Sequence, residues 1–225
     1  MLSAAFETST RSPSVALAIE GEILEERLSG ARPHASDLLP ALDRLLSKSG
    51  HGVGELGLIV VGTGPGSFTG LRVAVATALG LARGTGAALF GLPSWEALCW
   101  RELEPGAEAA VVQDARGGSL YFAHYRREVD GVLALRAPCL IQPSELEALV
   151  PTRLRLFAES GIEQLAQRSP DALAQLSVDR SPYASALLEL GLLRHRLEGP
   201  HTPAQLEPLY LRAFASPPKP RSASK

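Results

Sequence analysis

The same order of elements occurs twice along this chain, and this repeat restricts the folds that the chain can adopt. In both places an apolar strand ends at an acidic residue, Glu7 or Asp114, and a tight polar turn leads into an alternating strand and then a third strand. The strands of the two copies are expected at residues 2–7, 14–20 and 22–28, and at 109–113, 119–125 and 132–135. The copies share this order but not their residue identities. Two such units with helices inserted predict a duplicated ribonuclease-H-like α/β fold.

The segments around these strands supply the helices and the remaining strands. Residues 34–49 carry leucines at helical spacing, and residues 71–83 are built largely from small side chains that also fit a helix. Further helices are expected at 93–100, 144–147 and 183–196, and further strands at 58–61, 87–90 and 154–157. The polar stretch 101–108 separates the halves. We therefore expect an N-terminal lobe over 1–105, a C-terminal lobe over 106–215 and a disordered basic tail over 216–225.

The charge balance limits the partners that this chain can bind by itself. The 225 residues include 22 Lys+Arg and 24 Asp+Glu, so the net charge is −2, which argues against strong direct binding to nucleic acid. Cys99 and Cys139 lie far apart in apolar surroundings and are interpreted as buried thiols in a reducing compartment. No signal peptide and no membrane-spanning stretch is recognisable. We expect a cytoplasmic protein without a membrane partner.

A glycine-rich segment is the most informative motif. Residues 62–70 read Gly-Thr-Gly-Pro-Gly-Ser-Phe-Thr-Gly and lie between an expected buried strand and a helix, where backbone N–H groups can bind an anion. No Lys-Ser/Thr pair follows the last glycine, as a Walker loop requires. The glycine spacing also departs from the dinucleotide fingerprint. The residues alone favour a tight turn that lets the following helix pack close to the sheet.

Other candidate sites each have a structural alternative that the residues alone favour. Glu7 and Asp114 could form a paired-carboxylate metal or acid/base site, but they equally read as two acids that end strands, and no third ligand is evident. Small residues four apart, such as Ala74 and Ala78, more often indicate packing within one chain than an interface. None of the five histidines has zinc-site spacing, and Ser67 lacks the flanks of a nucleophile elbow.

Several motifs together resemble those of the TsaB (YeaZ) family. The segment Gly-Pro-Gly-Ser-Phe-Thr-Gly-Leu-Arg at 64–72 is the most specific of them. The others are the strand, turn and strand over 5–17, His34 with Leu38, Leu39 and Pro40, Asp114-Ala115-Arg116 with Tyr121, and Pro-Leu-Tyr-Leu-Arg at 208–212. The resemblance runs through nearly the whole chain. One departure is Glu7, where TsaB proteins more often have Asp and the related TsaD proteins have Glu.

The resemblance implies an actin-like, Hsp70-like ATPase architecture, in agreement with the duplicated unit. It also implies an accessory protein that is not an enzyme by itself. The related TsaD proteins transfer a threonylcarbamoyl group to a tRNA adenosine beside the anticodon, and they carry a metal-binding H-x-x-x-H motif. Residues 92–98 of this chain, where that motif would lie, contain no histidine. The implied partners are a TsaD-type enzyme, a TsaE-type ATPase, tRNA through the complex, and a second copy of the chain when TsaD is absent.

The resemblance also assigns residues to these roles. The implied partner interface contains His34, Leu38, Leu42, Leu45, Phe68, Gly70, Leu71, Ala74 and Ala78. The family glycine loop contains Gly64, Pro65, Gly66, Ser67, Thr69 and Arg72, and vestigial nucleotide-side turns contain Glu7, Thr8, Ser9, Asp114 and Arg116. No metal and no tightly bound cofactor is expected, although ATP could bind at the interface of the complex. Two alternatives remain, a peptidase and a small-molecule kinase or nucleotide-binding protein of the same fold, and the kinase would need magnesium at Glu7 and Asp114.

Overall fold

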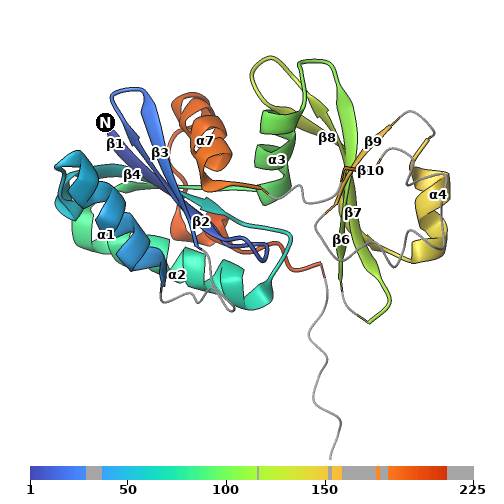
Figure 1. Ribbon diagram of the computed structural model, residues 1–225, viewed down its shortest axis with the longest axis horizontal. Coiled ribbons are helices and arrows are strands. Elements are labelled where there is room, and N and C mark those ends of the chain that lie inside the picture. The colour runs from blue at the N-terminus through green and yellow to red at the C-terminus, as the bar shows by residue number, and fades with distance from the viewer. Residues whose placement is uncertain (29–36, 116, 152–153, 159–175, 178–181, 212–225) are drawn as a thin grey trace, which may run out of the picture.

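The computed structural model describes residues 1–28, 37–115, 117–151, 154–158, 176–177 and 182–211. These residues form two lobes, each built on a five-stranded sheet with helices against it (Figure 1). His34, Arg116 and the predicted tail over 216–225 lie outside the described residues.

The first sheet has the strand order β3-β2-β1-β4-β5. Its strands are β1 (Leu2–Glu7), β2 (Ser14–Ile19), β3 (Glu22–Arg27), β4 (Leu56–Gly62) and β5 (Ala88–Leu92). The first three strands are antiparallel neighbours, whereas β4 runs parallel to β1 and β5 runs parallel to β4. The strands predicted for this half of the chain are therefore confirmed.

The second sheet repeats this topology with the order β10-β9-β6-β7-β8. Its strands are β6 (Glu108–Asp114), β7 (Leu120–Arg127), β8 (Val132–Ile141), β9 (Arg155–Ala158) and β10 (Leu176–Ser177). Again three strands are antiparallel, and β9 runs parallel to β6 and β10 parallel to β9. The duplicated fold is thus confirmed. Strand β8 extends beyond the predicted 132–135 because Cys139 and Leu140 continue the pairing with β7.

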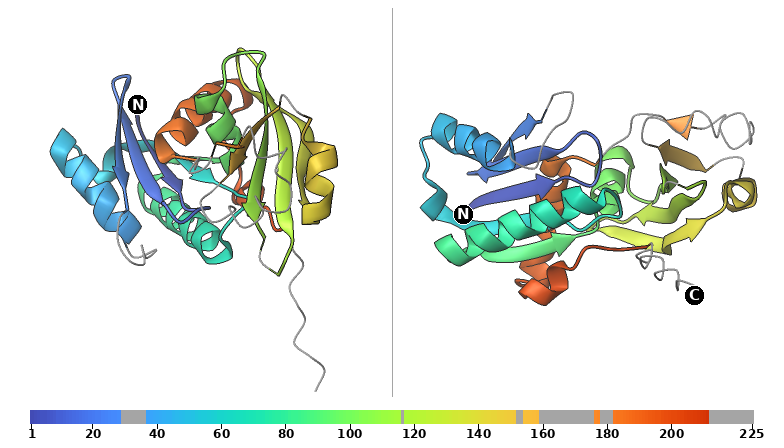
Figure 2. Two further views of the ribbon diagram at one scale, coloured as in Figure 1. Left: turned by 45° about the vertical axis from the view of Figure 1, so that its right-hand side comes forward. Right: turned by 90° about the horizontal axis from the view of Figure 1, so that it is seen from below.

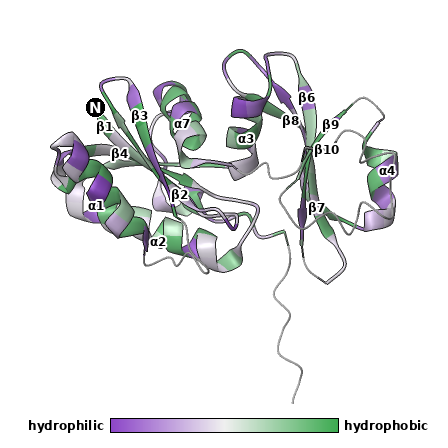
Figure 3. Cartoon of the chain, in the orientation of Figure 1, coloured by the Kyte–Doolittle hydropathy of each residue, from purple (hydrophilic) through white to green (hydrophobic). Residues whose placement is uncertain are grey.

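Both faces of the first sheet are covered by helices. Helix α1 (Leu38–Ser49) and helix α2 (Phe68–Thr85) lie on one face, and α7 (Ala184–Glu198) lies on the other (Figure 2). The outer helix α1 carries both hydrophobic and hydrophilic residues, as expected for a helix with one buried side (Figure 3). Pro40 lies in the first turn of α1, where its missing N–H costs little.

The second sheet is also covered on both faces. The 3₁₀ turn η3 (Pro143–Glu145) and α4 (Leu146–Leu149) lie on one side, where Leu146 enters the core with Phe122 and Ile141. Helix α3 (Ser94–Glu102) covers the other side through Trp95 and its neighbours.

The division between the lobes differs from the predicted boundary in one respect. Helix α7 packs against β1, β2 and β4 of the first sheet, and Leu206 of the 3₁₀ turn η4 (Pro203–Leu206) joins the core on the opposite face of that sheet. The end of the chain therefore returns to the first lobe, so the predicted C-terminal lobe over 106–215 is wrong from α7 onward. The choice of sheet is made by long-range packing, which helical periodicity at 183–196 does not report.

Candidate functional site

The glycine loop connects β4 to α2 at the end of the sheet where β1 also ends. Gly62 is the last residue of β4, and α2 begins at Phe68. The hydroxyl of Ser67 caps α2 by accepting a hydrogen bond from the Gly70 N–H at 3.3 Å. The loop is held to α3 through Ser94, whose hydroxyl accepts from the Gly64 N–H at 3.2 Å and whose N–H donates to the Gly64 carbonyl at 2.9 Å.

Three of the glycines are required by the turn that follows β1. A Cβ added at Gly62 would overlap the Oε2 atom of Glu7. A Cβ at Gly66 would overlap the backbone of Ser9, and one at Gly70 would overlap the carbonyl oxygen of Thr8. The Ser67 N–H also donates to the Ser9 carbonyl at 2.7 Å. The turn over 7–9 and the glycine loop are therefore in direct contact.

Glu7 is a fully buried acid at the centre of this contact. Its Oε1 atom accepts a hydrogen bond of 2.6 Å from the Ser9 N–H, whereas no described residue makes a well-aligned hydrogen bond to Oε2. Burial raises the pKa of Glu7 and outweighs the opposing hydrogen bonds from Ser9. The hydroxyl of Thr8 is also buried without a hydrogen-bond partner among the described residues. Burial therefore disfavours the ionised form of Glu7 relative to an exposed glutamate.

Glu7 and Asp114, the candidate acid pair, lie in different surroundings. Asp114 lies at the exposed end of β6, whereas Glu7 is buried under the glycine loop. Among the described residues, no group of three or more His, Cys, Asp or Glu side chains is arranged to bind a metal ion. No described helix combines the length and hydropathy that crossing a membrane would require.

The partner interface implied by the resemblance needs a correction. Six of its side chains are buried in the core of the first lobe and cannot contact a partner: Leu38, Leu42, Leu45, Leu71, Ala74 and Ala78. They form the sides of α1 and α2 that face the sheet. Phe68 remains 37% exposed and Gly70 is half-buried.

The exposed side of α2 is made by other residues. Ser67, Thr69 and Arg72 are exposed at its start, whereas Gly64 and Pro65 of the loop are buried and Gly66 is half-buried. Farther along the helix, Ala76 and Gly80 are exposed, and no atom lies within 4 Å of a Cβ added at Gly80. The small-residue row on the surface is therefore Ala76 and Gly80.

An aromatic cluster joins the start of α2 to the last described residues of the chain. The Arg72 guanidinium lies 3.8 Å from the centre of the Phe68 ring and donates from Nε to the Tyr210 hydroxyl at 3.0 Å. The Phe68 and Tyr210 rings are 5.1 Å apart, and the neighbouring Leu209 N–H donates to the Thr63 carbonyl at 2.8 Å. We call Phe68, Arg72 and Tyr210 the aromatic clamp. The sequence singled out both of its segments but did not predict that they meet.

Comparisons with known proteins agree with this geometry. The family model described as "TsaD: tRNA N6-adenosine threonylcarbamoyltransferase" matches residues 27–198. The protein named "tRNA threonylcarbamoyladenosine biosynthesis protein TsaB" from Haemophilus influenzae is 35% identical over 126 residues, which are 55% of this chain and 53% of that protein. The Escherichia coli protein of the same name is 32% identical over 131 residues, 57% of this chain and 56% of that protein. The chain thus spans about half the length of the curated relatives it matches.

The structural comparison extends over more of the chain. The solved structure titled "YeaZ from Pseudomonas aeruginosa" superposes with a TM-score of 0.80 at 28% sequence identity. The superposition covers 93% of this chain and 99% of that one. The similarity therefore includes both lobes.

Proposed function

Since this chain belongs to the family of the tRNA N6-adenosine threonylcarbamoyltransferases, and within it to the TsaB (YeaZ) proteins, we propose that it is the non-catalytic partner of a TsaD-type enzyme. In this role it is required for the threonylcarbamoyladenosine modification of tRNA next to the anticodon. The TsaD-type enzyme carries out the transfer. This chain supplies a docking surface and does not bind the reacting groups.

The observation that carries the non-catalytic role is the contact between the turn over 7–9 and the glycine loop. In an enzyme of this architecture the two segments would flank a phosphate. Here Thr8 and Ser9 lie directly on Gly70 and Gly66, and burial disfavours the ionised form of Glu7. A buried carboxyl group whose ionised form is disfavoured is poorly suited to bind magnesium, which prefers ionised oxygen ligands. The same contact disfavours the alternative of a small-molecule kinase.

We assign the docking surface to the exposed side of α2 and the start of α1. It contains Phe68, Arg72, Ala76 and Gly80, together with Leu39, which is 51% exposed. Aromatic and arginine side chains are frequent at the centres of interfaces, and small residues let a partner helix approach closely. Because TsaD belongs to the same family, its corresponding helices could pair with this surface in a two-fold-like manner. A second copy of this chain would cover the same surface when TsaD is absent.

The other members of the complex follow from this role. A TsaE-type ATPase would join the pair, and ATP would be used upstream to make the threonylcarbamoyl adenylate and would also bind at the interface. Contact with tRNA would come mainly from the partners, because the net charge of this chain is −2.

Co-expression with the TsaD protein of the same organism tests the proposal. Threonylcarbamoyl transfer to tRNA is measured for the mixture and for each protein alone, and activity is expected only in the mixture. Phosphoryl transfer by this chain alone, without stimulation of TsaD, would instead support the kinase alternative.

A matched pair of variants tests the surface. Ala76→Arg places a large charge on the exposed side of α2 and should abolish co-purification with TsaD, whereas Ala148→Arg, on the exposed side of α4, should not affect it. Ala74→Arg is unsuitable because Ala74 is buried, and the variant would test folding. Equal co-purification of the Ala76 and Ala148 variants would contradict the assigned surface.

A further inference from the structure

Helices α3 and α7 meet where the two lobes meet. Helix α3 lies against the second sheet and α7 against the first (Figure 1). The residues that pack there are Trp95 and Cys99 of α3, and residues such as Leu187 of α7. Ala97 of α3 joins the core of the first lobe beside α7. A contact between these helices therefore couples one lobe to the other.

Three side-chain contacts link α3 to α7 and to Tyr183, the residue before α7. Arg194 donates from Nη1 to Glu96 at 2.8 Å, and the Trp100 indole N–H donates to Glu189 at 3.4 Å. The guanidinium of Arg101 lies 3.9 Å from the centre of the Tyr183 ring. The Glu96–Arg194 contact is the most enclosed ion pair of the junction, with side chains 13% and 30% exposed.

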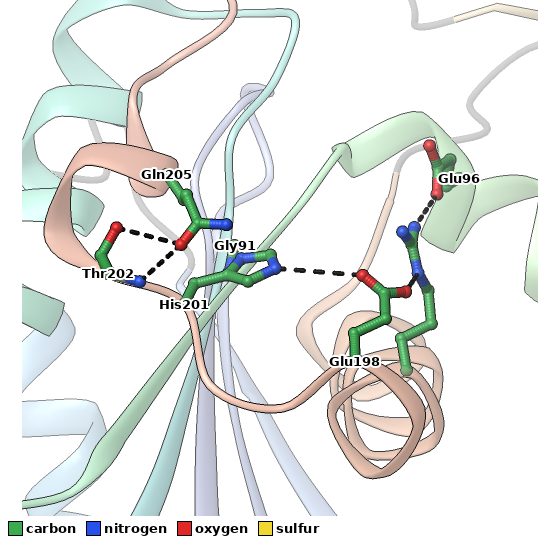
Figure 4. Close-up of polar contacts among 7 residues, drawn as sticks. Gly91, Glu96, Glu198, His201, Thr202 and Gln205 are labelled. Carbon is green, nitrogen blue, oxygen red and sulfur yellow. Dashed lines mark hydrogen bonds and ion pairs between the residues drawn. The ribbon is translucent and has the colours of Figure 1, made fainter.

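The charges at this contact are unbalanced. Arg194 also donates from Nε to Glu198 at 2.6 Å, so one guanidinium serves two carboxylates (Figure 4). When both acids are ionised, Arg194, Glu96 and Glu198 together carry one net negative charge. The charge of Glu96 is then largely buried. Burying a charge that is not fully compensated is unfavourable.

A nearby histidine does not supply the missing positive charge. His201 Nε2 lies 4.0 Å from Glu198, but its Nδ1 accepts a hydrogen bond of 3.1 Å from the Gly91 N–H (Figure 4). A protonated ring would carry hydrogen on Nδ1 and lose this bond. The ring is also stacked on Phe90 at 4.0 Å, and burial lowers the pKa of His201. Protonation of the ring is therefore disfavoured both by burial and by its hydrogen bond with Gly91.

We propose that Glu96 and Arg194 form a pH-sensitive latch between the lobes, closed when Glu96 is protonated and loosened when Glu96 is ionised. A protonated Glu96 still accepts the hydrogen bond from Arg194, and Arg194 then balances Glu198 alone. An ionised Glu96 regains water when α3 moves away from α7, so the junction opens more readily. This device does not depend on the proposed partner role.

The surroundings of Glu96 support this direction. Arg194 and Glu198 face it from α7, and the phenol of Tyr125 and the thiol of Cys99, both neutral, face it from β7 and from α3 itself. The charged residue of β8, Arg136, lies instead by Phe122. Burial raises the pKa of Glu96 to about 7, and the nearby Glu198 adds to this effect while Arg194 opposes it. The change of charge therefore occurs near neutral pH.

The sign of the effect on stability follows from linkage. The folded pKa of Glu96 lies above its ordinary value of 4.5, so the stabilisation is complete below pH 4.5 and is lost as the pH rises through about 7. Wild-type protein should therefore melt at a lower temperature at pH 8.5 than at pH 5.5, with about 5 °C of the difference due to Glu96. Glu96→Gln, which is neutral at every pH, should lack this part of the change.

The experiment compares the full-length wild type with Glu96→Gln and with a control, Glu189→Gln, at the same junction. Subtracting the melting curves of the variant from those of the wild type cancels other titrating groups such as Glu7. The radius of gyration from small-angle scattering should increase toward pH 8.5 in the wild type and in Glu189→Gln, but stay constant in Glu96→Gln. A carbon-13 titration of the Glu96 carboxyl group should have its midpoint near 7 and move upward in Arg194→Gln.

Either of two results would overturn the latch. One is an unchanged pH dependence of melting and scattering in Glu96→Gln. The other is a Glu96 titration at the ordinary value for a glutamate. If Arg194→Gln fails to fold, Arg194→Lys keeps the charge but cannot bridge both acids in the same way, and it should raise the titration midpoint by a smaller amount.

Discussion

Arg72 and Tyr210, 138 positions apart in the chain, are joined by a hydrogen bond of 3.0 Å from the guanidinium Nε to the phenol oxygen. This bond ties the last described segment to the start of α2, and the Phe68 ring under the guanidinium completes the aromatic clamp. The clamp gives the proposed docking surface a fixed shape. A preorganised surface loses less conformational entropy when a partner binds.

Substitutions in the aromatic clamp should separate the contribution of its hydrogen bond to stability from the contribution of its stacking. Tyr210→Phe removes the bond and keeps the ring, so it should lower the free energy of unfolding by about 0.5–1 kcal/mol. Arg72→Ala also removes the guanidinium from the Phe68 ring and should cost about 1–2 kcal/mol. Urea unfolding of both variants measures these values. An Arg72→Ala loss no larger than that of Tyr210→Phe would show that the stacking contributes nothing.

Because Gly62 is in contact with Glu7, replacing Gly62 by alanine should affect stability very differently from the same replacement at a glycine with open space around it. Gly62→Ala puts a methyl group where Oε2 of Glu7 lies, so it should destabilise the protein by about 2 kcal/mol or more. Gly84→Ala, in the exposed last part of α2 with open space at the Cβ position, should stabilise by about 0.5–1 kcal/mol. Thermal unfolding compares the two. Similar effects from both would mean that the turn over 7–9 can move away from the loop at little cost.

The raised pKa of Glu7 can be tested by measuring stability at several pH values. Its folded pKa is raised above the ordinary value of 4.5, so its stabilising contribution is complete below pH 4.5 and is lost as the pH rises through the folded pKa. Glu7→Gln keeps an oxygen for the Ser9 N–H and never ionises.

The stability of this variant relative to wild type should therefore increase from pH 5 to pH 8. Urea unfolding at several pH values measures the difference, and Glu96→Gln on the same series serves as an independent comparison. A difference that stays constant with pH would mean that Glu7 is ionised in the folded protein over the whole range.

Much of the fold could be predicted from local patterns. The strand over 2–7, the glycine loop and the repeated order around Asp114 each have a signature within a few residues. The place of α7 could not be predicted in this way, since helical periodicity does not indicate which sheet a helix packs against. The Ser14 hydroxyl, which accepts a hydrogen bond of 2.8 Å from the Ala184 N–H, is one of the long-range contacts that decide it.

The sequence pattern also did not show which side chains of the candidate site are exposed. Two rows of small residues on α2 have four-residue spacing, one through Ala74 and Ala78 and the other through Ala76 and Gly80. The pattern alone does not say which row faces the sheet, and the resemblance selected the buried one. The clamp was missed because Arg72 and Tyr210 meet only in the folded chain.

If the exposed side of α1 contacts the partner, a buried and an exposed leucine of this helix should behave differently when they are replaced by alanine. Leu45 is buried among the strands and helices of the first lobe, whereas Leu39 is 51% exposed on the same helix. Leu45→Ala should lower the free energy of unfolding by about 2–5 kcal/mol, because it leaves a cavity in the core. Leu39→Ala should change it by less than about 0.5 kcal/mol.

The two variants should show the opposite order in binding. Leu39→Ala should weaken the complex with TsaD in a titration at a temperature where both variants are folded, and Leu45→Ala should bind almost as the wild type does. This result is expected because only an exposed side chain can lose contact area with a partner when it is truncated. Weaker binding by folded Leu45→Ala than by Leu39→Ala would mean that TsaD rearranges α1 and uses the leucine stripe after all.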